Sequence, residues 1–291
     1  MSTPHTASGL HGNEIRKLQD QARSVRTLII DTISRAGCGH TGGSLSAVEI
    51  LVALYFRAMR IDPRKPDRPD RDRLILSKGH ASAGYYCTLA RRGYFPEAKL
   101  AEFDAMDSML QGHPCMRTTP GVDMTTGSLG QGLSVGIGMA LGRDRRRMDF
   151  RVYVLMGDGE LQEGQVWEAA MYAGAHKLTG LVGIVDYNKV QLAATVAETL
   201  DLEPLADKWE AFGWSVLECD GHDMAQVVAA LERAKGISGP VVVLAHTVKG
   251  KGVSFMEGRH QWHGRAPDEQ EKRRALAEID GRPDQARTHE P

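Results

Sequence analysis

Apolar residues recur along the chain with two different spacings, and each spacing predicts a kind of element. From residue 13 to 36 they repeat at helical intervals, which predicts a first helix. In 151–156 and 181–186 they occupy successive positions, as expected of parallel strands that are covered on both faces. Further strands are predicted at 73–77, 215–219 and 240–245.

Helices are predicted between these strands. A capping box of Ser46 and Glu49 begins a helix that runs to about Met59, and further helices span 161–177 and 223–235. The alternation predicts an α/β fold that is doubly wound, with a mainly parallel sheet and helices on both faces.

Composition and charge restrict the class of protein. The chain has 291 residues, 42% of them hydrophobic, and 36 Lys and Arg are balanced by 37 Asp and Glu. A formal net charge of -1 argues against binding to nucleic acid or a membrane surface. We expect one α/β domain over residues 13–279, between a disordered N-terminus (1–12) and a disordered tail (280–291).

The cysteines and the N-terminus indicate the compartment. Four cysteines without a CxxC pair predict neither a zinc ribbon nor a disulfide scaffold. No apolar run reaches the ~18 residues of a membrane span, and the N-terminal residues lack the apolar core of a signal peptide. We therefore expect a cytoplasmic protein.

Polar residues that suit a metal site follow two of the predicted strands. Gly157-Asp158-Gly159 comes after the strand at 151–156, and Asn188 comes after the next strand. A carboxylate, an amide oxygen and a backbone carbonyl are ligands for Mg²⁺ or Ca²⁺, completed by phosphate oxygens. The alternative is a pair of turns, in which Asp158 caps the following helix and Asn188 takes a left-handed conformation.

The same residues resemble a known family. Gly157-Asp158-Gly159 followed by Asn188 is similar to the thiamine diphosphate motif, in which Asp and Asn hold the metal under the diphosphate. Four further loops occur in the order found in transketolases, over about residues 15–275: Gly39-His40, Ser77-Lys-Gly-His80, Gly112-His113-Pro114 and Gly127-Ser-Leu-Gly-Gln-Gly132. The run from Lys249 to Met256, with Trp262-His263-Gly264, resembles the N-terminal subunit of a split transketolase.

The resemblance implies a cofactor site on the thiamine diphosphate-binding fold. It makes Asp158, Asn188 and the Val190 carbonyl the ligands of Mg²⁺, for which Ca²⁺ can substitute. It makes Glu163 the acidic residue that links cofactor sites across the subunit interface. The full set of implied cofactor-binding residues is His80, Ser128, Leu129, Gly130, Gly157, Asp158, Gly159, Glu163 and Asn188. One position departs from the family pattern: many relatives have a second Asp or Asn where this chain has Tyr187. This residue is not an expected metal ligand.

Histidines are the implied catalytic residues. His40, His80 and His113 would surround the thiazolium ring and substrate, where transketolases use histidines for proton transfer and hydroxyl recognition. A further active-site histidine corresponds to His263 or His260, and the sequence does not choose between them. These two are spaced as zinc ligands can be, but no third ligand of suitable spacing accompanies them.

The implied activity is transfer of a two-carbon ketol unit between sugars or sugar phosphates. The thiamine ring needs a Glu from a pyrimidine-binding domain, for which we expect no room after the last predicted strand. A C-terminal transketolase subunit is therefore the expected partner, in an α₂β₂ assembly. The donor and acceptor sugars stay open. So do two alternatives, a 2-oxoacid dehydrogenase subunit of the E1 α type and a non-catalytic homologue that binds a partner.

Overall fold

Five parallel strands form the centre of the molecule, in a computed structural model that describes residues 12–281. The strand order is β1-β2-β3-β5-β4, and each neighbouring pair is parallel. The strands are β1 (Arg73–Leu76), β2 (Val152–Gly157), β3 (Leu181–Tyr187), β4 (Ser215–Asp220) and β5 (Val241–His246). They confirm all five predicted strands to within two residues, together with the doubly wound α/β fold.

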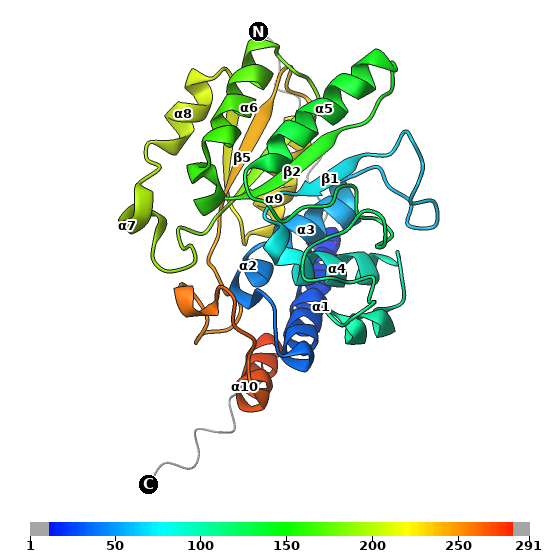
Figure 1. Ribbon diagram of the computed structural model, residues 1–291, viewed down its shortest axis with the longest axis vertical. Coiled ribbons are helices and arrows are strands. Elements are labelled where there is room, and N and C mark those ends of the chain that lie inside the picture. Colours follow the sequence, from blue (N-terminus) through cyan, green and yellow to red (C-terminus); the bar gives the residue numbers. More distant parts are fainter. Residues whose placement is uncertain (1–11, 282–291) are drawn as a thin grey trace.

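One group of helices covers the first face of the sheet, with a core of its own (Figure 1). The long helix α1 (Gly12–Ala36) agrees with the helix predicted at 13–36, and α9 (Met224–Lys235) agrees with the one predicted at 223–235. The members of this group are α1 (Gly12–Ala36), α2 (Thr41–Ser46), α3 (Val48–Ala53), α4 (Ser82–Arg92) and α9 (Met224–Lys235), and α10 (Glu269–Ile279) packs against α1.

A second group of helices covers the other face over a separate core (Figure 1). It consists of α5 (Gln131–Arg145), α6 (Gly164–Ala175), α7 (Val196–Leu200) and α8 (Leu205–Ala211). The sequence pattern did not predict α7 or α8. Shorter 3₁₀ turns lie at Gly79–Ala81, Glu97–Glu102, Gly159–Gln162 and His260–Trp262, and a π-helical turn at Leu54–Ala58.

The predicted capping box at Ser46 is wrong. Ser46 is the last residue of α2 and its hydroxyl donates to Asp186 (2.6 Å), while Glu49 pairs with Arg26 (2.6 Å). Both side chains are buried, so bonds to distant buried groups replace the local bonds of a capping box. The helix predicted from Ser46 to about Met59 is instead divided into α2, α3 and the π turn.

The predicted disordered ends lie outside the described residues, apart from three positions. Gly12 begins α1, and Asp280 and Gly281 follow α10. No helix between residues 12 and 281 is both long and apolar enough to cross a membrane.

Candidate active site

A cavity of about 290 Å³ lies at the carboxyl ends of the strands. Four of its charged or amide side chains each follow a different strand: Lys78 after β1, Asp158 after β2, Asn188 after β3 and Lys249 after β5. Parallel strands end at the same edge of a sheet, which is where ligands bind in open α/β folds. The complete lining is Gly43, Lys78, His80, Leu129, Gly157, Asp158, Gly159, Glu160, Asn188, Val190, Gln191, Leu192, Lys249 and His263.

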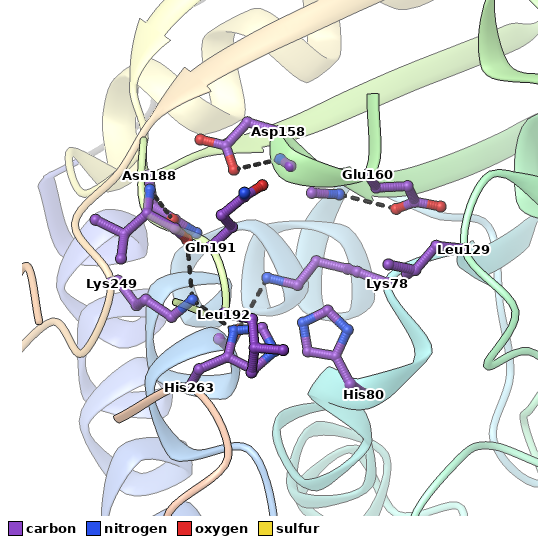
Figure 2. A pocket seen from close by; sticks show the side chains of 14 residues that line it. Lys78, His80, Leu129, Asp158, Glu160, Asn188, Gln191, Leu192, Lys249 and His263 are labelled. Atoms are coloured by element: carbon purple, nitrogen blue, oxygen red, sulfur yellow. Dashed lines mark hydrogen bonds between the residues drawn. The ribbon is translucent and has the colours of Figure 1, made fainter. Parts of the chain in front are cut away.

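The three expected metal ligands line this cavity together (Figure 2). One oxygen of Asp158 accepts from the Gly159 N–H (2.8 Å), and the other accepts from the Lys189 N–H. The Asn188 amide oxygen accepts from the Val190 N–H (3.0 Å). The alternative pair of turns is therefore partly present: Asp158 caps a 3₁₀ turn, although Lys189 and not Asn188 is left-handed (φ 63°).

A second carboxylate, Asp186, accepts a hydrogen bond from the Asn188 amide nitrogen (3.3 Å). It is fully buried and accepts from the Lys78 ammonium and from the hydroxyls of Ser46 and Thr247. Its burial alone would raise its pKa, but the Lys78 charge and these hydrogen bonds lower the pKa below its ordinary value. For Asp158 the net effect is in the other direction. Burial and the nearby Asp186 charge raise the pKa of its carboxyl to about 6.

Glu160 ties three loops of the site together. One oxygen accepts from the Ser77 hydroxyl and from the Gly130 N–H (2.9 Å), and the other accepts from the Gly157 N–H (3.0 Å). Its side chain is buried, which raises the pKa of its carboxyl. Glu160 therefore fixes the glycine-rich backbone that faces the cavity.

Two buried lysines lie between the metal-ligand candidates and the histidines (Figure 2). Lys78 donates to the Gly43 carbonyl (3.1 Å) as well as to Asp186. Lys249 donates to the Val190 carbonyl (2.9 Å) and to Nδ1 of His263 (2.8 Å). Burial and the Lys78 charge lower the pKa of Lys249 to about 8.

The structure brings four of the five candidate histidines together. The ring centroids of His80 and His263 lie 5.0 Å apart, and that of His40 lies 5.1 Å from His80 and 5.3 Å from His263. His113 lies beside His40, at 6.4 Å. His260 begins a 3₁₀ turn and does not line the cavity, whereas His263, the other member of the pair that the sequence left open, does.

Burial favours the neutral imidazole at three of these histidines, His40, His80 and His263. The pKa of His80 is lowered well below its ordinary value by burial and by the Lys78 charge. Burial and Lys249 lower the pKa of His263 to about 3, and burial and His113 lower that of His40. A neutral imidazole has one donor and one acceptor nitrogen, so His40 and His80 can recognise a hydroxyl or accept a proton. Nδ1 of His263 accepts from Lys249, which leaves its Nε2–H as a donor to a hydroxyl.

The remaining cofactor candidates lie on the loop before α5 and at the start of α6. Ser128 and Leu129 are exposed, and Leu129 lines the cavity. Gly130 is left-handed (φ 81°), and a Cβ there would lie 2.9 Å from Cβ of Glu163, so this close approach requires glycine. The Glu163 side chain itself is exposed at the N-cap of α6.

Sequence reasoning did not assign four of the charged residues of the site: Lys78, Glu160, Asp186 and Lys249. A signal was present for each of them. Asp186 is a charge near the end of an otherwise apolar strand, and the other three stand within the glycine-rich motifs at strand ends. Burying a charge in either place is energetically unfavourable unless the charge has a partner or a ligand.

Comparisons with known proteins agree with this geometry. The family model described as the transketolase, thiamine diphosphate binding domain matches residues 18–286. The chain is 48% identical, over 90% of its length and 96% of the relative, to the 6-deoxy-6-sulfo-D-fructose transketolase subunit SqwG of a Clostridium species. It is 46% identical, over 90% of its length and 96% of the relative, to one of the subunits of the apulose-4-phosphate transketolase of Actinobacillus succinogenes.

Among solved structures, the transketolase from Campylobacter jejuni superimposes with a TM-score of 0.86 at 34% identity. The match covers 92% of this chain but 43% of that transketolase, so the similarity spans less than half of the longer protein. The chain therefore belongs to the transketolase family, whose thiamine diphosphate-binding domain its residues 18–286 match.

Proposed function

We propose that this chain is the thiamine diphosphate-binding subunit of a split transketolase, which transfers a two-carbon ketol unit between sugars together with a second subunit. The observation that carries the proposal is one cavity in which Asp158 and Asn188 face the pair His80 and His263 (Figure 2). The two relatives named as subunits are matched over 96% of their length, which supports the split arrangement. Neither an E1 α subunit nor a non-catalytic homologue is favoured, because these relatives are transketolase subunits.

The donor set of the cavity fits a divalent cation under a diphosphate. Asp158, Asn188 and the Val190 carbonyl supply only oxygen, which is the preference of Mg²⁺ and Ca²⁺. The Asn188 and Val190 oxygens already accept one hydrogen bond each, and each has a second lone pair for a metal. A buried carboxylate at Asp158 favours a cation in contact with it. Gly157 leaves room for the diphosphate, because a Cβ there would meet no atom closer than 3.9 Å.

Thiamine diphosphate, when bound, supplies the electron sink for breaking and forming a carbon–carbon bond next to a carbonyl. The chain's own residues bind and orient the reactants. His80 and His263 present neutral rings to the cavity and would exchange protons with substrate hydroxyls, a role that His40 and His113 would share at its edge. Glu160 keeps the Gly130 and Gly157 backbone in place against the cofactor.

The partner would cover the open side of this cavity. Leu129 and Leu192 line it with exposed side chains, 36% and 67% exposed, and Glu163 is exposed beside Gly130. Exposed apolar side chains at a polar site are typical of an interface. We propose that a C-terminal transketolase subunit supplies the Glu that activates the pyrimidine ring, in an α₂β₂ complex with two-fold symmetry. A cytoplasmic location stays a prediction from the sequence.

The substrate class follows from the histidines and the relatives. Four imidazoles in one cluster suit a ligand with several hydroxyls. The names of the two relatives specify a sulfonated ketose and a sugar phosphate. We propose phosphorylated or sulfonated sugars as donor and acceptor.

Replacing the one charged ligand tests the metal and cofactor site. Asp158→Ala should abolish Mg²⁺-dependent binding of thiamine diphosphate, because the repulsion of the diphosphate charges would lose its main compensation. The measurement is titration calorimetry of the complex with its partner chain, with and without Mg²⁺. Asp207→Ala, at an exposed position of α8, is the control and should bind like the unmodified complex. Unchanged affinity in Asp158→Ala would refute the assignment.

A further inference from the structure

A buried charged cluster lies outside the cavity, and the function proposed above assigns it no role. Glu49 of α3 receives two hydrogen bonds from the Arg26 guanidinium of α1, at 2.6 and 2.7 Å. The same carboxylate bonds Nδ1 of His222 (3.0 Å), in the turn between β4 and α9. Glu49 is 6% exposed, and the side chains of Arg26 and His222 are 11% and 13% exposed.

The hydrogen bonds of His222 define its tautomer. The backbone N–H of Val248 donates to Nε2 of the ring (2.8 Å). A backbone N–H can only donate, so Nε2 carries a lone pair and the ring proton is on Nδ1, facing Glu49. His222 therefore transmits the position of the Glu49 carboxylate to the backbone of Val248.

Arg26 holds the same loop three residues further on. Its Nε donates to the Lys251 carbonyl (3.1 Å), while its two terminal nitrogens bind Glu49. The loop is thus fixed at Val248 by His222 and at Lys251 by Arg26, and Glu49 orients both. Between these two points Lys249 extends into the cavity, where it bonds the Val190 carbonyl and His263.

We propose that His222 is a positioning residue for the cofactor site: oriented by Glu49, it holds the Val248 backbone so that Lys249 reaches Val190 and His263. The proposal rests on the proposed function for its effect on activity, but its effect on the loop is independent of that function. Partners that orient the groups of a metal site commonly change affinity or activity by 10–100-fold when they are removed.

Two substitutions separate positioning from simple packing. His222→Leu removes both ring bonds, whereas His222→Gln keeps an oxygen that can accept from Val248 and an amide that can donate to Glu49. In the complex with the partner, His222→Leu should weaken thiamine diphosphate binding roughly tenfold, and His222→Gln should recover most of the loss. His246→Leu is the control, since that imidazole also bonds a glutamate, Glu218 (2.7 Å), on the neighbouring strand β4.

A double-mutant cycle shows whether the effect passes through Lys249. In a Lys249→Met background, adding His222→Leu should change cofactor affinity less than twofold, because the group that it positions is already absent. Additive effects of the two substitutions would overturn the proposal. An unmodified complex that neither binds the cofactor nor transfers ketol groups would instead contradict the proposed function.

Hydrogen exchange of the full chain tests the loop without any activity. His222→Leu should speed exchange of the Val248 amide about tenfold relative to the unmodified chain, while amides of β2 and β3 keep their protection. In His222→Gln the Val248 amide should exchange at nearly the same rate as in the unmodified chain. This variant also tests the proposal if His222→Leu does not fold. Unchanged Val248 exchange in a folded His222→Leu chain, or a uniform increase across the sheet, would overturn the positioning role.

Discussion

Burial determines what single residues of the cavity can do. His80 and His263 are neutral because their surroundings are buried and already hold the Lys78 and Lys249 charges. A charged imidazole would be a poor proton acceptor, so this environment suits rings that must exchange protons with a substrate. His260 lies outside the cavity.

Substitution of His80 should therefore reduce activity far more than substitution of His260. His80→Ala should fold and bind cofactor but lose ketol transfer by roughly 10²–10⁴-fold, the usual effect of removing a positioned acid–base group. His260→Ala should stay within a few-fold of the unmodified protein. Both are measured as kcat of the complex with the partner chain. Near-normal turnover of His80→Ala would make His80 a structural loop residue.

The buried carboxylate of Glu49 should make the free energy of unfolding depend on pH in the acid range. Burial would raise the pKa of Glu49, but the Arg26 charge and the His222 hydrogen bond lower it to about 2, from an ordinary value of 4.5. Because the folded-state pKa is lowered, the stabilisation is present above about pH 4.5 and is lost as the pH falls toward 2.

Glu49→Gln should therefore flatten the pH dependence of unfolding in this window and lower stability at pH 7 by about 3 kcal/mol. Urea unfolding of the full chain at several pH values measures both effects. Glu210→Gln, at an exposed position of α8, is the control and should leave the profile unchanged. Parallel profiles for Glu49→Gln and the unmodified chain would contradict the prediction.

At the scale of elements, α6 lies against the chain that leaves α8. A Cβ on Gly174 of α6 would lie 1.7 Å from the Phe212 carbonyl oxygen and 2.8 Å from its carbon. The Phe212 backbone cannot move aside as easily as the end of a flexible side chain can. The distance between α6 and this segment therefore requires glycine at position 174.

Two glycines of the same helix give a matched test. Gly174→Ala should destabilise the chain by about 1–3 kcal/mol, the usual cost of overpacking. Gly164→Ala, whose Cβ would meet nothing within 4 Å, should be neutral or stabilise by up to about 1 kcal/mol through helix propensity. Denaturant unfolding of the full chain compares them. Equal effects would mean that α6 can move away from Phe212.

For the whole molecule, the site is expected to need two chains. The cavity opens past Leu129 and Leu192, and by the family resemblance the Glu that activates the pyrimidine ring belongs to another domain. The purified chain with Mg²⁺ and thiamine diphosphate should show no ketol transfer, and mixing it with its partner should restore activity in a complex with the mass of two chains of each kind. Robust turnover by the chain alone, free of copurifying protein, would refute the split-enzyme proposal.

The sequence by itself determined the sheet and the location of the chemistry. Runs of successive apolar residues predict β2 and β3, because strands that are covered on both faces need apolar side chains at every position. Asp158 and Asn188 were predictable as neighbours, because parallel strands end at one edge. The histidine loops were found by family resemblance, and their spacing alone does not bring them together.

Only the tertiary structure decided which polar groups face one another. Ser46 and Glu49 have the spacing of a capping box, yet they bond Asp186 and Arg26, which are far away in the sequence. His260 and His263 are equivalent in the sequence, but Lys249 bonds His263. In each case the hydrogen bonds of a buried group must be satisfied by whatever the fold brings near, and local spacing does not specify that partner.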